Sequence, residues 1–175
     1  MKGLVHIYTG DGKGKTTAAV GLGVRACGRG LRVLMVQFLK GAETGEIHSL
    51  KKLEPGFVLH RAEEIKKFTW NMNEAELRRA AEIQQGILKY AVDASLTGNW
   101  DIIILDEVMG ALAAGMLKLG DIIRFIEEKP GGLELVLTGR NAPPELLALA
   151  DYISEIQALR HPMEKGIPAR IGIES

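Results

Sequence analysis

Glycines and lysines alternate near the amino terminus in a pattern that could bind phosphate. Residues 8–17 read Tyr-Thr-Gly-Asp-Gly-Lys-Gly-Lys-Thr-Thr, between an apolar run at 4–8 and a helix-compatible segment at 16–27. Glycines allow successive backbone N–H groups to turn toward one anion, and a helix that follows presents further N–H groups. Lys15 would add a positive charge, and the Thr16 hydroxyl would be a ligand for Mg²⁺. This order of strand, loop and helix predicts a phosphate-binding loop.

The match to the phosphate-loop pattern is incomplete at one position. The pattern G-x-x-x-x-G-K-[ST] ends correctly at Gly14-Lys15-Thr16, but Thr9 occupies its first position instead of glycine. A lone Gly-Lys-Thr would fit a glycine-rich turn with solvated lysines equally well. Three alternating glycines between a strand and a helix favour the phosphate loop.

An acidic pair after a buried strand is the second candidate for chemistry. The apolar residues 102–105 lead directly into Asp106 and Glu107. In phosphate-loop proteins such a strand lies beside the loop, and its terminal acid binds Mg²⁺ directly or through water while the neighbouring acid orients water or a hydroxyl. A solvated strand end is the alternative interpretation. The loop at 10–17 favours a metal role for both acids.

Further candidates follow other apolar runs. Arg140 ends the sequence Thr-Gly-Arg after one such run, where a guanidinium could reach phosphates or hold an acid, although a surface position explains it equally well. Lys40 and Glu46 lie in a polar loop at the carboxyl end of a strand, where ligands bind in open α/β sheets, and again a surface role is the alternative.

Phe68 and Trp70 stand out in a chain with 5% aromatic residues. Their side chains could bury against the protein and so anchor a loop, or they could form a wall for a large flat ligand. Residue type alone favours the role as loop anchor.

Composition narrows the functional class. At 175 residues the chain predicts one domain, residues 1–175, which is long enough to bury a core without the help of disulfides or a structural metal. Lys plus Arg and Asp plus Glu number 22 each, so no overall basic field favours nucleic-acid binding. The single cysteine, Cys27, excludes an intramolecular disulfide and fits the apolar side of the first helix. No apolar stretch reaches the ~20 residues of a membrane span, and the first strand begins without a targeting segment, so we expect a cytoplasmic protein.

Apolar runs alternate with helical periodicity along the chain. The helix after residue 73 has a capping-box pattern, with Asn73 as cap and Glu76 three positions on. Strands are predicted at 4–8, 31–39, 57–61, 100–107, 133–138 and 152–156, with a last edge segment at 169–174; helices are predicted at 16–27, 47–53, 74–96, 108–116, 119–128 and 143–151. The fold prediction is α/β, with a mainly parallel central sheet flanked by helices in a P-loop NTPase (RecA-like) architecture.

Taken in order, the motifs resemble those of one family, the P-loop type of ATP:corrinoid adenosyltransferase. The resemblance covers nearly the whole chain, through residues 9–19, 25–26, 36–41, 68–70, 105–107, 137–140, 149–151 and 161–174. Thr9 at the irregular loop position belongs to the family pattern. Asp11 departs from it, because the family commonly has Asn there, and longer members carry an N-terminal helical extension that covers the partner subunit's active site.

The resemblance implies transfer of the 5′-deoxyadenosyl group of ATP to cobalt(I) of a reduced corrinoid, with release of triphosphate, in adenosylcobalamin biosynthesis or salvage. It implies that the triphosphate is held in reverse of the usual P-loop orientation. It also implies Mg²⁺ at Thr16 and Glu107, with Asp106 as a further ligand, and makes Lys15, Thr16 and Glu107 the catalytic residues. The ATP-binding residues it implies are Thr9, Gly10, Asp11, Gly12, Lys13, Gly14, Lys15, Thr16, Thr17, Arg25 and Arg140.

Phe68 and Trp70 correspond by position to the corrinoid pocket, where an apolar wall excludes the lower axial ligand. The resemblance thus replaces the anchor interpretation of these two residues. It further implies a homodimer and an electron-donating reductase that generates cobalt(I).

Two other functions remain open from the residues alone. A P-loop ATPase could use hydrolysis to drive a conformational change, with Glu107 orienting water, and a noncatalytic carrier would bind both ligands without turnover. The neutral net charge and the Phe-Thr-Trp segment weigh against the ATPase. The products separate the possibilities, since a transferase yields triphosphate and an ATPase yields ADP and phosphate.

Overall fold

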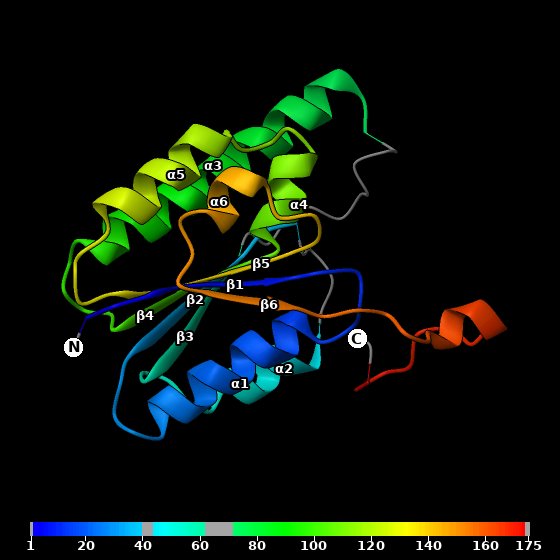
Figure 1. Ribbon diagram of the computed structural model, residues 1–175, viewed down its shortest axis with the longest axis horizontal. Coiled ribbons are helices and arrows are strands. Elements are labelled where there is room, and N and C mark those ends of the chain that lie inside the picture. Colours follow the sequence, from blue (N-terminus) through cyan, green and yellow to red (C-terminus); the bar gives the residue numbers. More distant parts are fainter. Residues whose placement is uncertain (1, 40–43, 62–71, 174–175) are drawn as a thin grey trace.

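The computed structural model describes residues 2–39, 44–61 and 72–173, and its centre is a six-stranded sheet. The strands are β1 (Val5–Thr9), β2 (Val33–Gln37), β3 (Phe57–Arg61), β4 (Ile102–Asp106), β5 (Glu134–Thr138) and β6 (Tyr152–Glu155). Their order across the sheet is β3-β2-β4-β5-β1-β6, and every neighbouring pair is parallel (Figure 1). The predicted α/β fold with a parallel central sheet is confirmed.

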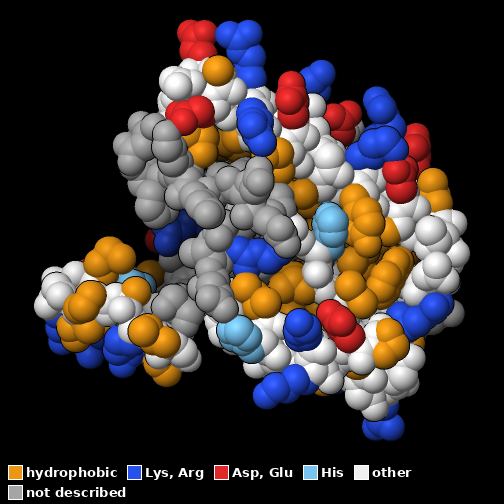
Figure 2. Space-filling view, turned by 180° about the vertical axis from the view of Figure 1, so that it is seen from behind, with side chains coloured by type: hydrophobic (Ala, Val, Ile, Leu, Met, Phe, Trp, Pro, Cys, Tyr) orange, Lys and Arg blue, Asp and Glu red, His pale blue; other side chains and the backbone are white. Residues whose placement is uncertain are grey.

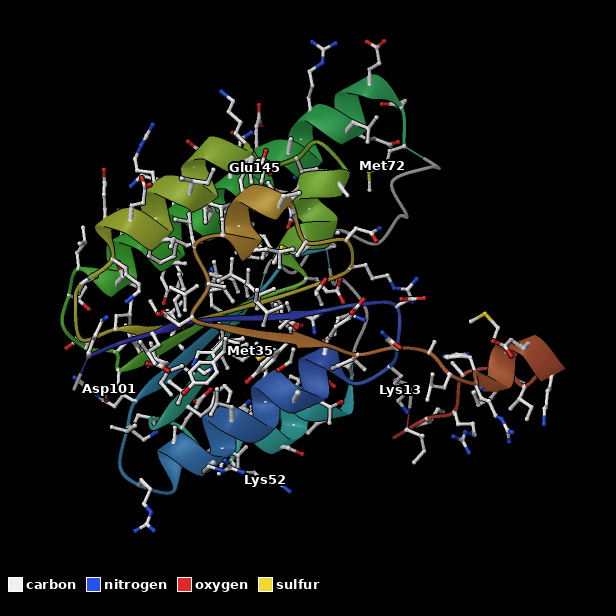
Figure 3. The ribbon with its side chains drawn as sticks, viewed as in Figure 1. Lys13, Met35, Lys52, Met72, Asp101 and Glu145 are labelled. Atoms are coloured by element: carbon white, nitrogen blue, oxygen red, sulfur yellow. The ribbon has the colours of Figure 1, made fainter. Side chains whose placement is uncertain are left out.

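Helices cover both faces of this sheet. On one face lie α1 (Lys15–Cys27) and α2 (Gly45–Lys51); on the other lie α3 (Glu74–Ser95), α4 (Val108–Ala113), α5 (Leu119–Glu128) and α6 (Pro144–Leu147) (Figure 1). Alternate strand residues therefore enter two different cores. Met35 points toward α1 (Figure 3), in the cluster that holds Ala19 and Leu50, whereas its neighbour Leu34 packs in the cluster of α3 and α5. Burial on both faces explains why β2 and β4 are apolar at nearly every position.

The predicted capping box at the start of α3 is confirmed. The Asn73 side chain accepts a hydrogen bond from the Glu76 N–H at 2.9 Å, and the Glu76 carboxylate accepts one from the Asn73 N–H at 3.0 Å. These bonds satisfy two N–H groups that a helix start leaves without intrahelical partners. The 22-residue helix then runs along the sheet as its longest cover.

Two predictions near the carboxyl terminus are wrong. α6 ends at Leu147 instead of continuing to Asp151, since the Asp151 carboxylate accepts a hydrogen bond from the Val5 N–H at 2.8 Å and the chain turns there into β6. Residues 169–173 form no strand, because Gly172 has φ +77°, in the left-handed region, and the chain leaves the sheet after β6 (Figure 1). Alternating isoleucines there imitate a strand pattern.

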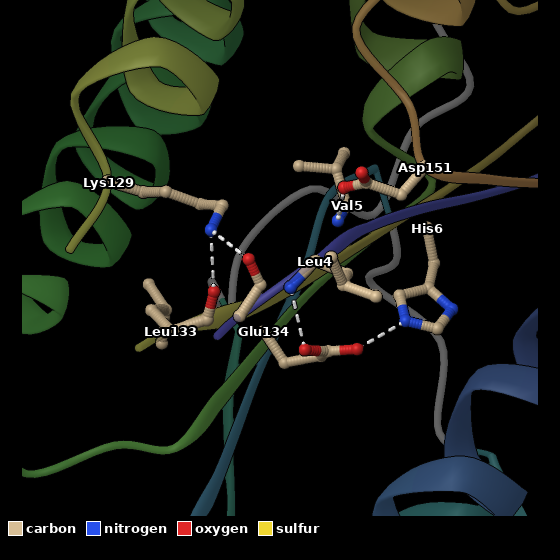
Figure 4. Close-up of polar contacts among 8 residues, drawn as sticks. Leu4, Val5, His6, Lys129, Leu133, Glu134 and Asp151 are labelled. Carbon is tan, nitrogen blue, oxygen red and sulfur yellow. Dashed lines mark hydrogen bonds and ion pairs between the residues drawn. The ribbon is translucent and has the colours of Figure 1, made fainter. Parts of the chain in front are cut away.

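The start of β1 is held by polar contacts that fix the strand leading to the glycine loop. The Glu134 carboxylate accepts a hydrogen bond from the Leu4 N–H at 2.8 Å and contacts His6 Nε2 at 2.5 Å (Figure 4). Together with the bond between Asp151 and Val5, these contacts tie β1 to the segments before and within its two neighbouring strands. The glycine loop thus begins from an anchored strand.

His60 gives the fold a testable pH dependence. Its ring stacks on Tyr90 with centroids 3.9 Å apart, and burial lowers the pKa of His60 below its ordinary value of 6.5. Between the lowered pKa and 6.5 the unfolded chain binds more protons than the folded chain, so the free energy of unfolding falls as the pH falls through this window. We expect His60→Phe, which keeps a stacked ring but cannot titrate, to lose less stability between pH 7 and pH 5 in urea unfolding. If both proteins lose the same free energy of unfolding between pH 7 and pH 5, His60 is not the source of the pH dependence.

Candidate functional site

A cavity of about 670 Å³ lies at the carboxyl edge of the sheet. One wall is the glycine loop, residues 11–17, and beside it lie residues 44–46, Glu107 and Arg140. The tail, defined here as residues 161–173, also contributes to the lining. Figure 3 shows Lys13 extending from the loop on the side of this tail. Ligands of open α/β sheets bind at this edge, and the volume suits a nucleotide-sized molecule.

The glycines of the loop serve two different needs. A Cβ on Gly10 would lie 2.4 Å from the Ile156 carbonyl oxygen, and one on Gly12 would lie 2.7 Å from the same atom. The Gly12 N–H also donates to that carbonyl at 2.7 Å, so this N–H is directed at the chain after β6. Gly14 differs, because a Cβ there would meet nothing within 4 Å, while its φ of +122°, like the +98° of Gly10, lies where L side chains are rarely found. Gly10 and Gly12 therefore permit close packing, while Gly14 permits the backbone turn into α1.

The Lys15 side chain places its buried ammonium group against the loop. Its side chain belongs to the first residue of α1, is 7% exposed, and donates from Nζ to the Gly12 carbonyl at 2.8 Å. Burial lowers the pKa of the Lys15 ammonium, and the neighbouring Glu107 carboxylate opposes that effect. Arg140 lies close enough to lower the same pKa further. Two cations thus face one loop, an arrangement that an anion would stabilise.

Asp106 is the centre of a buried hydrogen-bond network, hereafter the Asp106 network. It is fully buried, and its Oδ1 accepts from the Thr16 hydroxyl at 2.8 Å and the Thr138 hydroxyl at 2.7 Å. Its Oδ2 accepts from the Gln37 amide at 3.2 Å. Gln37 and Asp106 are partners in the β2–β4 register, so their side chains point to the same face, toward α1. These donors offset the cost of burying a carboxylate.

Glu107 has an uncommon backbone conformation at the start of α4. Its φ of +62° and ψ of +22° lie in the left-handed region, which non-glycine residues seldom adopt. The Glu107 N–H donates to the Thr138 hydroxyl at 2.9 Å, and the same hydroxyl donates to Asp106. Thr138 therefore couples the two acids. The turn directs the Glu107 side chain to the cavity, which it lines together with Lys15 and Thr16.

The oxygen atoms of this region fit a magnesium ion. Thr16 and Glu107 line the cavity with a hydroxyl and a carboxylate, and Asp106 orients the Thr16 hydroxyl. Within the described ranges, no group of three or more His, Cys, Asp or Glu side chains forms a ready-made metal cage. Mg²⁺ in nucleotide sites is held by one or two protein oxygen ligands together with phosphate oxygens and water. The donor set is therefore of the type that Mg²⁺ shares with a polyphosphate.

Thr138 allows a direct test of the network. We expect Thr138→Val, which is nearly isosteric, to lower the free energy of unfolding by about 1–3 kcal/mol, because the Glu107 N–H loses its acceptor and Asp106 loses a donor. Thr138→Ser keeps the hydroxyl and should lose less. Urea unfolding of both variants measures the difference, and a valine variant as stable as wild type would show that the hydroxyl contributes nothing.

Comparison with known proteins identifies the family. The family model for "ATP:corrinoid adenosyltransferase BtuR/CobO/CobP" matches residues 1–175. The chain belongs to the ATP:corrinoid adenosyltransferase family. The resemblance in the sequence motifs is thereby confirmed.

Curated relatives agree with this assignment. The corrinoid adenosyltransferase of Escherichia coli K12 is 35% identical over 175 residues, covering 99% of this chain and 86% of the relative. Corrinoid adenosyltransferase CobA of Salmonella typhimurium is 34% identical, with the same two shares. The Pseudomonas aeruginosa corrinoid adenosyltransferase is 33% identical and covers 99% and 84% of the two chains.

A solved structure supports the fold alone. ATPases 2 and 3 of EssC from Geobacillus thermodenitrificans superpose with a TM-score of 0.50 and 13% sequence identity. The superposition covers 98% of this chain but 36% of the EssC chain. It supports the α/β ATPase-like architecture.

The structure gathers most, but not all, of the residues expected to act in this family member. One cavity is lined by residues 11–17, Glu107 and Arg140. Asp106 accepts a hydrogen bond from the Thr16 hydroxyl of this lining. Thr9 lies at the loop base, where its hydroxyl accepts from the Ala142 N–H at 3.3 Å, and neither Thr9 nor Gly10 lines the cavity.

Arg25 is an expected site residue that lies away from the cavity. Arg25 is exposed in the last turn of α1, at the end of that helix remote from the loop, and it does not line the cavity. Its role in ATP binding stays a prediction. Phe68 and Trp70 lie outside the described residues, as does Lys40.

Sequence reasoning assigned no role to Gln37, Thr44 or Thr138. Gln37 and Thr138 join the Asp106 network, and Thr44 lines the cavity. Gln37 and Thr138 did carry a signal, because each is the polar last residue of an otherwise apolar strand. Thr44 lies in the polar segment 40–46 that the sequence places at the carboxyl end of a strand, but its residue type alone did not single it out.

No helix in the described parts of the chain is both long enough and apolar enough to cross a bilayer.

Proposed function

We propose that this protein transfers the 5′-deoxyadenosyl group of ATP to cobalt(I) of a reduced corrinoid and releases triphosphate, in adenosylcobalamin biosynthesis or salvage. The full-length match to the adenosyltransferase family carries the proposal. The cavity supports it, because a loop suited to a polyphosphate faces the Thr16 hydroxyl and the Glu107 carboxylate.

The reaction is a displacement at C5′ of the nucleotide. Cobalt(I) supplies the electron pair of the new cobalt–carbon bond, and the C5′–O bond breaks with its electron pair leaving on the triphosphate. No protein side chain need be the nucleophile. The chain must instead hold the triphosphate and stabilise the charge that it gains, a task that suits Lys13, Lys15 and Arg140 around the cavity.

Thr16 and Glu107 would hold Mg²⁺ in this site. The ion would supply further positive charge to the leaving triphosphate. Asp106 would act through Thr16, because its carboxylate accepts a hydrogen bond from the Thr16 hydroxyl and leaves the lone pairs of that hydroxyl oxygen free to face a metal ion. The Asp106 network would therefore set the orientation of a ligand atom.

The other parts of the proposal concern partners. Phe68 and Trp70 would form the apolar wall of the corrinoid site, and a reductase would deliver electrons to the cobalt. We further propose a cytoplasmic homodimer of single-domain chains, residues 1–175, that does not use nucleic acid as a partner.

An anaerobic assay tests the proposal. The purified protein is incubated with Mg-ATP and chemically reduced cob(I)alamin, and both the corrinoid spectrum and the phosphate products are followed. Light-sensitive adenosylcobalamin formed together with an equal amount of triphosphate would support the transferase. ADP and phosphate without a corrinoid change would reject it in favour of a P-loop ATPase, the alternative that the loop and the acidic pair also fit.

A further inference from the structure

We propose that a groove between α3 and α5 binds a small organic anion with an apolar body, of the alkyl carboxylate class. These two helices lie side by side on the sheet face opposite α1 (Figure 1). The groove shares no lining residue with the cavity beside the glycine loop. The proposal therefore adds a second binding site and does not depend on adenosyl transfer.

The groove has the size of a small-molecule site. Its volume is about 460 Å³, and every residue that lines it belongs to α3, to α5 or to the cap position of one of these helices. Small-molecule sites commonly measure about 300–1,000 Å³. Where α5 approaches α3, the Gln85 amide of α3 donates to the Met116 carbonyl at 3.4 Å, a contact that joins α3 to the chain just before α5.

The floor of the groove is apolar. Leu88 and Phe125 are 6% and 4% exposed and belong to the core between the sheet and these helices, with Val92 packed against it. The hydroxyl of Ser95 donates to the Val92 carbonyl at 2.6 Å, so its proton is already used. Leu96, the residue that caps the end of α3, extends the apolar lining and is 70% exposed. Such a floor favours the hydrocarbon part of a ligand.

The rim of the groove carries more positive than negative charge. Its cations are Lys89, Lys118 and Arg124. Lys89 pairs with Asp93, whereas the side chains of Lys118 and Arg124 form no hydrogen bond or ion pair in the described parts of the chain. Lys118 also stands at the cap position of α5, where the helix dipole adds positive potential. An anionic head group would gain from these charges.

Two carboxylates limit the charge that the ligand can carry. Asp121 and Glu128 of α5 line the same groove, so its side chains sum to one positive charge. Strongly negative ligands such as polyphosphates would meet these acids, while a monoanion could lie against Lys118 or Arg124 alone. An apolar floor with one excess positive charge therefore fits an alkyl monocarboxylate.

Nuclear magnetic resonance locates the ligand, with decanoate as the probe. Addition of decanoate to ¹⁵N-labelled protein should shift the backbone amide signals of Leu88, Val92 and Phe125 and leave those of the glycine loop in place. Decylamine has the same chain with a cationic head group. We expect it to bind about fivefold more weakly or worse, because its charge faces the cations of the rim.

Two substitutions test the wall and the rim. Leu96→Ser should weaken decanoate binding about three- to tenfold, since it removes apolar surface without opening the core, whereas Leu159→Ser removes a leucine that is 87% exposed outside the groove and should change nothing. Lys118→Gln should weaken binding about two- to fivefold. Its control is Lys52→Gln at the end of α2, on the other face of the sheet (Figure 3). Thermal unfolding establishes that each variant is folded.

Four outcomes would overturn the assignment. Decanoate could cause no shifts, or shifts confined to the glycine loop, which would place it in the other cavity. Equal binding of decanoate and decylamine would show that the groove does not select an anion. If sedimentation velocity shows a dimer that Leu96→Ser converts to monomer, a second copy of the chain occupies the groove. None of these results bears on the transferase assay, so the proposed function stands or falls separately.

Discussion

Lys15→Ala should reduce adenosyl transfer by about a thousandfold, the scale seen when one preorganised charge-stabilising group is removed from an active site. The Lys15 ammonium is buried beside the loop and would lie against the triphosphate as negative charge accumulates on it. Burial already lowers its pKa, so a bound anion would gain from this cation and in turn favour its charged form. Initial rates with Mg-ATP and cob(I)alamin measure the effect.

A matched lysine gives the control for this experiment. Lys89→Ala removes an exposed lysine that pairs with Asp93 on α3, far from the loop in sequence, and should leave the rate unchanged. Thermal unfolding of both variants establishes that they are folded. A folded Lys15→Ala protein with wild-type transfer would show that the loop does not stabilise the leaving triphosphate.

Asp106→Asn should separate catalysis from stability. Asparagine retains an oxygen that can accept from the Thr16 and Thr138 hydroxyls, while its new NH₂ group would face Gln37. Gln37 Oε1 has no partner in the described structure, so a half-turn of this amide offers an acceptor to the new donor. We therefore expect the free energy of unfolding to change by no more than about 1 kcal/mol.

The same substitution removes the negative charge that lies against Thr16. Transfer should fall by about a hundredfold or more, because the metal region loses a carboxylate, and the Mg²⁺ concentration needed for half-maximal ATP binding should rise. Asp93→Asn, at an exposed ion pair on α3, serves as the control and should change neither property. If a folded Asp106→Asn protein transfers the adenosyl group at the wild-type rate and with the wild-type Mg²⁺ dependence, the Asp106 charge has no role in the reaction.

The C-terminal tail illustrates how far a local pattern can mislead. Residues 169–174 alternate apolar and polar side chains, which predicts a strand, but the described part of this segment leaves the sheet and exposes Ile171 at 97%. Figure 2 shows apolar side chains on several sides of the projecting tail. Strand formation depends on a partner edge at the right place, and the tail does not run along β6. Its actual position, where it lines the same cavity as the glycine loop, follows from the packed fold alone.

The sequence by itself determined the parts of this protein that depend on neighbours along the chain. The glycine loop, the acidic pair after an apolar strand, the Asn73 capping box and the alternation of strands and helices are short-range patterns, and the parallel sheet follows from that alternation. Tertiary structure alone decided that Gln37 and Thr138 hold Asp106 and that Thr44 lines the same cavity as the loop. The Asp106 contacts depend on strand order and register, which bring together residues 31 to 90 positions apart and which no local pattern records.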